Sequence, residues 1–224
     1  PRNPQILGAL KIPGYSNYLH PFDENHIIGF GKDAVDPQEL EDEGFAGGRG
    51  FDFAWYQGMK IALFDVTDVA NPKLMFNETV GDRGTESELL NNHRALLYDK
   101  ANNLFSFPVT VNEIPAEEKT GEYTGSAYGK PVFQGAYVYT LDLENGFQLK
   151  GKITHYEDPD EFKKAGGYFY GDERSIKRIV RIGDYLFTIS DAKVKATDRN
   201  SMQDSKSVEL EKDPEEVYPV EYLE

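Results

Sequence analysis

The sequence predicts an all-β fold made of repeated four-stranded antiparallel units, and three observations support this. Short runs rich in aromatic and β-branched residues alternate with Asp-, Asn- and Gly-rich turns, as expected for strands and hairpins. The chain also aligns with itself at an offset of 77 residues (56 to 133). Apart from a short helical turn at 158–165, no segment keeps the 3.6-residue period of an amphipathic helix.

The repeat relates separated segments in one register. Residues 56–66 align without a gap on residues 133–143, and residues 26–30 align on residues 103–107 at the same offset. A third, weaker copy follows at 176–198. Because self-similarity at a fixed period is the mark of a repeat architecture, we expect each copy to be one structural unit.

Each unit holds four strand-like runs. They are residues 16–22, 26–31, 58–66 and 73–80 in the first unit, 93–98, 103–109, 135–143 and 147–155 in the second, and 176–182, 185–190, 193–198 and 206–210 in the third. Four antiparallel strands at a fixed period are typical of a β-propeller blade. The sequence therefore predicts a single segment over 1–224, a partial β-propeller of about three blades at 15–82, 91–156 and 174–211.

Long loop insertions separate the second and third strands of the first two units, at 31–56 and 108–133. In an up-and-down blade, this link lies on the same face as the link between blades, because strand direction reverses at each step. We therefore expect both insertions to share one face with the inter-blade links 81–92 and 156–175. Loops on a rigid scaffold are where binding sites are usually built.

The ends of the chain do not complete a ring. Residues 5–12 resemble the outer strand of a preceding blade, and residues 212–224 are interpreted as a tail or linker. Propellers close with about four to eight blades. Two explanations stay open: a fragment whose missing blades lie upstream, which we favour, or a homodimer in which a second copy covers the open blade edges.

Composition excludes some functions. The formal net charge of −15 and the pI near 4.7 argue against nucleic acid as a partner, because phosphate binding needs a basic surface. There are no cysteines, so disulfides and thiolate metal sites are excluded. No run approaches the roughly 20 apolar residues of a transmembrane helix. No signal peptide opens the chain, which leaves a signal further upstream as an alternative.

Three aspartates, Asp65, Asp142 and Asp198, occupy corresponding strand ends in the three units. Aspartate side chains bond to backbone N–H groups one or two residues further on and so begin turns. We interpret all three as structural turn residues, because this role explains them without any ligand.

Two sets of residues are candidates for metal binding. His20 and His93 fall in or beside the first strands of their blades, which line the channel of a propeller, and imidazoles there could hold a transition metal. Hydrogen bonds to neighbouring strands are the favoured alternative. Asp36, Glu39 and Asp42 are weaker candidates for Ca²⁺, since the insertion lacks the regular spacing of a calcium loop and a solvated acidic loop is favoured.

Other candidate binding residues lie near the same face. Arg94, Arg174, Lys177 and Arg178 could form an anion pocket, or they could neutralise the acidic insertions, and both interpretations stay open. Trp55, the only tryptophan, lies at the end of the first insertion. The chain contains neither a phosphate-binding P-loop nor a Gly-x-Ser-x-Gly nucleophile turn.

Segments 12–32, 58–73 and 181–193 carry a family resemblance. The chain resembles secreted prokaryotic proteins that end in a β-propeller domain distantly related to WD40 repeats. Segment 58–73 also resembles LVIVD-type blades, in which a strand ends in Asp-Val-Ser/Thr-Asp and the turn ends in Asn-Pro. The resemblance implies a propeller fold and a secreted or cell-envelope location, but no catalytic residues, and fold alone does not give function.

Two functional hypotheses follow. The first is a non-catalytic extracellular or cell-envelope binding or scaffold module that contacts a protein, peptide or glycan and needs no cofactor. The alternative is a propeller hydrolase or lyase with a metal in the central channel at His20 and His93. We favour the first, because the sequence holds no catalytic signature, so an enzyme is not the expected outcome. A purely structural part of a larger envelope protein is a third hypothesis.

Overall fold

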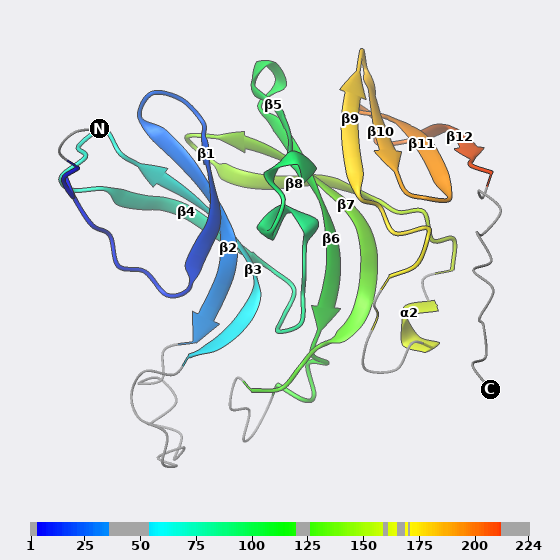
Figure 1. Ribbon diagram of the computed structural model, residues 1–224, viewed down its shortest axis with the longest axis horizontal. Helices are drawn as coiled ribbons and strands as arrows, with labels where there is room; N and C mark the ends of the chain where they lie inside the picture. The colour runs from blue at the N-terminus through cyan, green and yellow to red at the C-terminus, as the bar shows by residue number, and fades with distance from the viewer. Residues whose placement is uncertain are drawn as a thin grey trace, which may run out of the picture.

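The computed structural model describes residues 4–35, 54–119, 126–158, 161–164, 169 and 171–211, and these form three four-stranded antiparallel sheets (Figure 1). The first sheet consists of β1 (Tyr15–Pro21), β2 (His26–Val35), β3 (Trp55–Asp65) and β4 (Lys73–Val80). The second consists of β5 (Leu97–Asp99), β6 (Leu104–Glu113), β7 (Lys130–Asp142) and β8 (Gly146–Ile153). The third consists of β9 (Arg178–Ile182), β10 (Tyr185–Ile189), β11 (Lys193–Asp198) and β12 (Asp204–Glu209). In each sheet the strands pair in sequence order, which confirms the predicted all-β fold with three propeller blades.

The helical segments of the described chain are all short. They are the 3₁₀ turns η1 (Glu88–Leu90), η2 (His93–Ala95) and η3 (Lys100–Asn102), and the α-helix α2 (Glu161–Lys164). Within the described ranges, no helix has the length and apolar character needed to cross a membrane.

The middle strands reach further into the predicted insertions than the sequence indicated. β2 continues to Val35 and β3 already begins at Trp55, while β6 continues to Glu113 and β7 begins at Lys130. These strand ends lie together with α2 on the lower side of the molecule in Figure 1. In each of these two blades, the insertion is therefore flanked by two long strands that pair with each other.

The predicted first strand of the second blade, at 93–98, is wrong in its first half. Residues His93–Ala95 form η2, and only Leu97–Asp99 pair with β6. The Asn92 side chain accepts a hydrogen bond from the Arg94 N–H at 3.2 Å, which begins a helical turn where the sequence suggested a strand.

The inter-blade link occupies the part of the β6 edge that this strand leaves free. Glu86 exchanges two backbone hydrogen bonds with Thr110, at 2.9 and 2.8 Å. The Asp82 N–H donates to the Asn112 carbonyl at 2.7 Å. The inner edge of β6 is therefore paired by two separate pieces of chain, the link and β5.

Residues 5–12 form no strand in the structure. A Cβ added at Gly8 would lie 2.2 Å from the Val69 carbonyl oxygen, so this segment runs against the turn between β3 and β4. Ile6 is almost fully exposed. No strand of the described chain pairs with these residues, and their assignment to a preceding blade stays a prediction.

Turns at the ends of β3, β7 and β11 are each begun by an aspartate. Asp65, Asp142 and Asp198 all accept a hydrogen bond from the backbone N–H two residues further on. The donors are Thr67 at 2.8 Å, Glu144 at 2.9 Å and Asn200 at 3.0 Å. Hydrogen bonds, chiefly from Thr67, Asn145 and Ser201, lower the pKa of the three carboxyl groups.

The second sheet is the centre of the core, because both of its faces are buried. On one face of β6, Phe105 and Phe107 meet Phe30 of the first sheet at ring centroid distances of 5.8 and 6.0 Å. On the other face, Leu104 packs in a cluster with Ile179 of the third sheet. Alternation along a single strand thus joins all three blades.

Polar contacts also cross between the sheets. The Tyr139 hydroxyl of β7 donates to Glu78 of β4 at 2.6 Å, and burial together with this bond raises the pKa of Tyr139. Arg181 of β9 lies 2.9 Å from the buried carboxylate of Asp99. His155, after β8, lies between Thr188 and Ser190 of the third blade and is 2% exposed.

The third sheet leaves apolar side chains uncovered. Val180, Ile182 and Val208 are between 41% and 65% exposed. Additional blades or a second copy of the chain would each cover such a face. Both the predicted fragment and the predicted homodimer stay predictions.

We expect Phe105→Ala to lower the free energy of unfolding by roughly 3–5 kcal/mol, because it removes a fully buried ring from between two blades. Urea denaturation measures this change. Leu149→Ala, at a position 43% exposed, is the control and should change stability by less than about 0.5 kcal/mol. A loss in Phe105→Ala as small as that in Leu149→Ala would contradict the packing of Phe105 between the two blades.

We also expect stability to depend on His155 at acidic pH. Burial first, then the charges of Lys195 and Lys193, lower the pKa of His155 to about 4. As the pH falls from about 6.5, the unfolded chain gains a proton that the folded chain does not bind, so the free energy of unfolding falls by up to roughly 3 kcal/mol near pH 4.

Substituting His155→Gln should remove this part of the decline, because glutamine does not titrate. Urea unfolding at several pH values measures the difference between wild type and variant. If the two curves stay parallel from pH 7 to pH 4, His155 does not titrate as expected.

Candidate functional site

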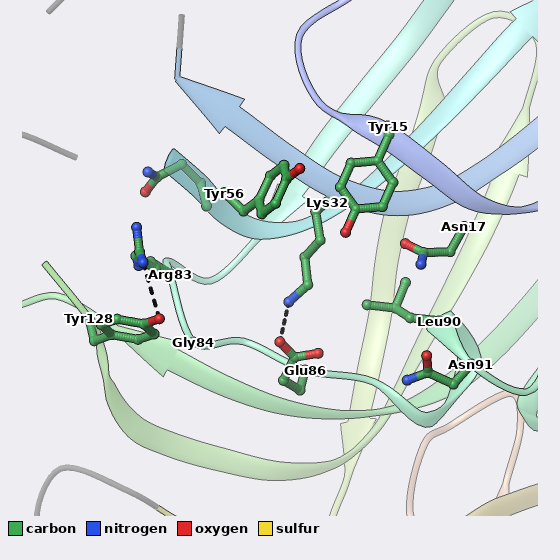
Figure 2. A pocket seen from close by; sticks show the side chains of 11 residues that line it. Tyr15, Asn17, Lys32, Tyr56, Arg83, Gly84, Glu86, Leu90, Asn91 and Tyr128 are labelled. Carbon is green, nitrogen blue, oxygen red and sulfur yellow. Dashed lines mark hydrogen bonds and ion pairs between the residues drawn. The ribbon is translucent and has the colours of Figure 1, made fainter. Parts of the chain in front are cut away.

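A pocket of about 270 Å³ opens where the first blade meets the inter-blade link (Figure 2). The first blade contributes Tyr15, Lys32 and Tyr56, and the link contributes Arg83 and Glu86. The remaining wall includes Tyr128, just before β7. The link between blades and the ends of the insertion-bearing strands thus meet on one face, and the pocket lies there.

Two glycines allow the link to bend sharply on either side of Arg83. Gly81 has φ +62° and Gly84 has φ +101°, both in the region that favours glycine. A Cβ at Gly81 would lie 2.3 Å from the Thr85 hydroxyl oxygen. The Arg83 carbonyl accepts a hydrogen bond from the Gly129 N–H at 2.8 Å. The backbone at Arg83 is therefore held between two blades.

The Arg83 guanidinium group rests on two aromatic rings. Its central carbon lies 4.2 Å from the ring centroid of Trp55 and 4.3 Å from that of Tyr128, which are cation–π distances. Nη2 donates to the Tyr128 hydroxyl at 3.1 Å. Nε and Nη1 are buried and have no hydrogen-bond partner, and Arg83 forms no ion pair within the described part of the chain. Buried donors of this kind are rare in folded proteins.

The charge of the second cation in the pocket, Lys32, is neutralised by a carboxylate. Lys32 is 8% exposed, and its Nζ donates to the Thr85 carbonyl and to the Glu86 carboxylate, the latter at 2.7 Å (Figure 2). The ring of Tyr15 stands edge-on to that of Tyr56, with centroids 5.1 Å apart. Burial, then the proximity of Tyr56 and Glu86, raise the pKa of Tyr15. Arg83 is thus the cation that gives the pocket its positive charge.

The chemistry of this lining suits recognition. Phenol rings provide flat apolar surface with a polar tip, and the side-chain amides of Asn17 and Asn91 both donate and accept hydrogen bonds. The guanidinium group provides donors for an acceptor of negative charge. Pockets that combine such walls with a few placed polar groups are typical binding sites.

Of the predicted site residues, Trp55 does not itself line the pocket but contacts Arg83, which does. Asp36, Glu39 and Asp42 lie outside the described residues. The calcium prediction therefore stays a prediction.

His20 and His93 come together around Tyr18. The Tyr18 hydroxyl lies 2.9 Å from His20 Nδ1, and the Tyr18 and His93 rings are 5.8 Å apart. Burial lowers the pKa of His20. Across the residues that the structure describes, no three His, Cys, Asp or Glu side chains are grouped so as to hold a metal ion. The metal prediction at His20 and His93 gains no support from this geometry.

Two of the four predicted cations, Arg174 and Lys177, pair with carboxylates outside the acidic insertions. Arg174 lies 2.6 Å from both Glu161 and Asp172, and Lys177 lies 2.5 Å from Asp191. Two further predicted cations differ from these: Arg178 donates to the Lys177 carbonyl at 3.3 Å, and Arg94 is exposed on η2. None of the four lines the Arg83 pocket.

Sequence reasoning missed Arg83 and Tyr128. A signal for the first was present in Gly81-Asp-Arg-Gly84, where an arginine stands in a glycine-flanked turn between blades. Tyr128 carried no local signal, since it meets Arg83 across a separation of 45 residues.

Comparison with known proteins identifies relatives. A family model described as "Beta propeller domain" matches residues 1–202. The chain is 35% identical over 171 residues to an uncharacterized protein of Archaeoglobus fulgidus, with 74% of this chain and 22% of that protein covered. It is 31% identical over 187 residues to the uncharacterized protein MJ1554 of Methanocaldococcus jannaschii, with 76% of this chain and 25% of that protein covered. The chain thus spans a quarter or less of the length of these relatives.

We expect Arg83→Ala to expose Trp55, because the guanidinium group covers its ring. Trp55 is the only tryptophan, so acrylamide quenching of intrinsic fluorescence reports on this site alone. Quenching should increase in Arg83→Ala and stay at the wild-type level in Arg94→Ala, which alters an exposed arginine outside the pocket. Equal quenching in all three proteins would contradict the contact.

Proposed function

We propose that this chain, which belongs to the β-propeller domain family, is a non-catalytic binding module whose ligand enters the Arg83 pocket. The observation that carries the proposal is the pair of buried N–H donors on Arg83 for which the described residues provide no acceptor. Fold alone gives no function, so the proposal rests on this site.

The free energy of the unbound state favours such a ligand. A buried donor without a partner costs about 1–3 kcal/mol, and a ligand acceptor would recover this cost. Apart from Tyr128, much of the site is already in place: Lys32 is fixed by Glu86, and the link is bonded to β6. A site held by a rigid scaffold loses little entropy when it binds.

The proposal includes an extracellular or cell-envelope location. It is supported by the resemblance of segments 12–32, 58–73 and 181–193 to secreted prokaryotic propeller proteins. A protein, a peptide or a glycan are the partner classes under consideration. No observation in the described residues favours the metal-dependent hydrolase or lyase.

Fluorescence of Trp55 allows a direct test. Panels of oligosaccharides, peptides and folded envelope proteins are titrated against the chain, and one class should change the emission saturably. Tyr128→Ala should weaken that binding at least about tenfold, as for an aromatic residue central to a binding site.

The matched control is Tyr185→Ala, which removes another exposed tyrosine, on the third blade and outside the pocket. It should bind as the wild type does. Absence of saturable binding to every panel, or equal loss in both variants, would contradict a binding module at this pocket.

A further inference from the structure

We infer that the pocket binds one acidic sugar unit of a glycan, with the carboxylate of the sugar accepting hydrogen bonds from Arg83. This inference rests on the proposed function, since it names the ligand class of the same site. It is argued from the charge of the pocket, the geometry of the guanidinium group and the composition of the remaining walls.

The positive charge of Arg83 favours an anion as the ligand. Lys32 is neutralised by Glu86 at 2.7 Å, whereas the described residues provide no carboxylate partner for Arg83. The pocket therefore has an unbalanced positive charge, although the whole chain has a net charge of −15. A carboxylate is a planar acceptor that matches the guanidinium group and forms short, charge-assisted hydrogen bonds with it.

The geometry limits how that carboxylate approaches. The guanidinium group of Arg83 packs on the rings of Trp55 and Tyr128. A hydrogen-bond acceptor must therefore reach its N–H groups from the edge of the guanidinium plane. Nε and Nη1 are buried, and one wall has to turn aside to admit the acceptor. Tyr128 is 57% exposed, and in this inference it is the wall that turns aside.

The other walls match a sugar ring. Sugar hydroxyls both donate and accept, as do the amides of Asn17 and Asn91, and the Glu86 carboxylate is a further acceptor. The rings of Tyr15 and Tyr56 offer apolar surface for the C–H face of a sugar. At about 270 Å³, the pocket is slightly below the roughly 300–1,000 Å³ of typical small-molecule sites, which suits one ring of a longer chain.

An acidic peptide also offers a carboxylate but fits this lining less well. Extended peptides are usually bound by strand addition at a sheet edge or in apolar grooves. Here phenols, amides and charged side chains surround the space (Figure 2). The observations therefore favour a saccharide, and a peptide is an outcome of the test.

Isothermal titration calorimetry on the full 224-residue chain tests the inference with three probes. These are a hexasaccharide of alternating glucuronic acid and N-acetylglucosamine, the same hexasaccharide with its carboxylates reduced to alcohols, and a hexaglutamate peptide. The acidic hexasaccharide should bind at least tenfold more tightly than either of the others. The reduced probe tests the carboxylate on the unaltered protein, so no variant has to fold for this comparison.

Arg83→Gln should abolish the tenfold preference for the acidic over the reduced hexasaccharide. Arg199→Gln makes the same change of charge on the third blade, outside the pocket, and should keep the preference. Three outcomes would each overturn the inference while leaving the proposed binding module in place. They are equal binding of the two hexasaccharides, tighter binding of hexaglutamate, and an equal loss of the preference in both variants. No binding of any probe would also overturn it, while the fluorescence panels decide the broader proposal separately.

Discussion

Burial of the second blade on both faces is the constraint on which the rest of the structure depends. The strands β6 and β7 place large aromatic rings against the first blade and smaller aliphatic side chains against the third. Since neither neighbour can bury its own apolar face alone, the two outer blades need this central sheet. Nearly every position of β6 is accordingly buried, including those of Ser106 and Asn112, rather than every second position.

The same sheet also positions the candidate site. Because η2 takes the place of the first half of the predicted strand 93–98, the inner edge of β6 is free to pair with the link at Glu86. That pairing, together with the bond from Gly129 to the Arg83 carbonyl, brings Arg83 between Trp55 and Tyr128. A departure from regular blade geometry therefore creates the pocket.

Much of the fold could be predicted because the repeat and its turn residues are local features. Runs of aromatic and β-branched residues between Asp- and Gly-rich turns located all twelve strands, most of them within a few residues. The helical turn at His93–Ala95 was missed because the side-chain cap from Asn92 outweighed an apolar run that fits a strand equally well. The face of the molecule on which the candidate pocket lies could be predicted from the alternating direction of the strands alone.

Individual site residues were harder to predict, because their role depends on contacts between distant segments. Trp55 could be identified by its rarity, but its partner Arg83 is 28 residues further on and becomes notable only once it is seen between two rings. Of the cations that stood out in the sequence, Arg174 and Lys177 proved to be paired with nearby carboxylates. Composition can suggest a charge but cannot show whether it is balanced.

The unequal size of the two apolar clusters has a consequence for how the molecule opens. Among the described residues, seventeen buried apolar side chains form the cluster of the first and second blades, whereas seven form that of the second and third. In a row of units that contact only their neighbours, the weaker junction separates first. The third blade can thus detach as a local unfolding unit while the first two remain folded. The pocket, which lies wholly between those two, would survive such partial unfolding.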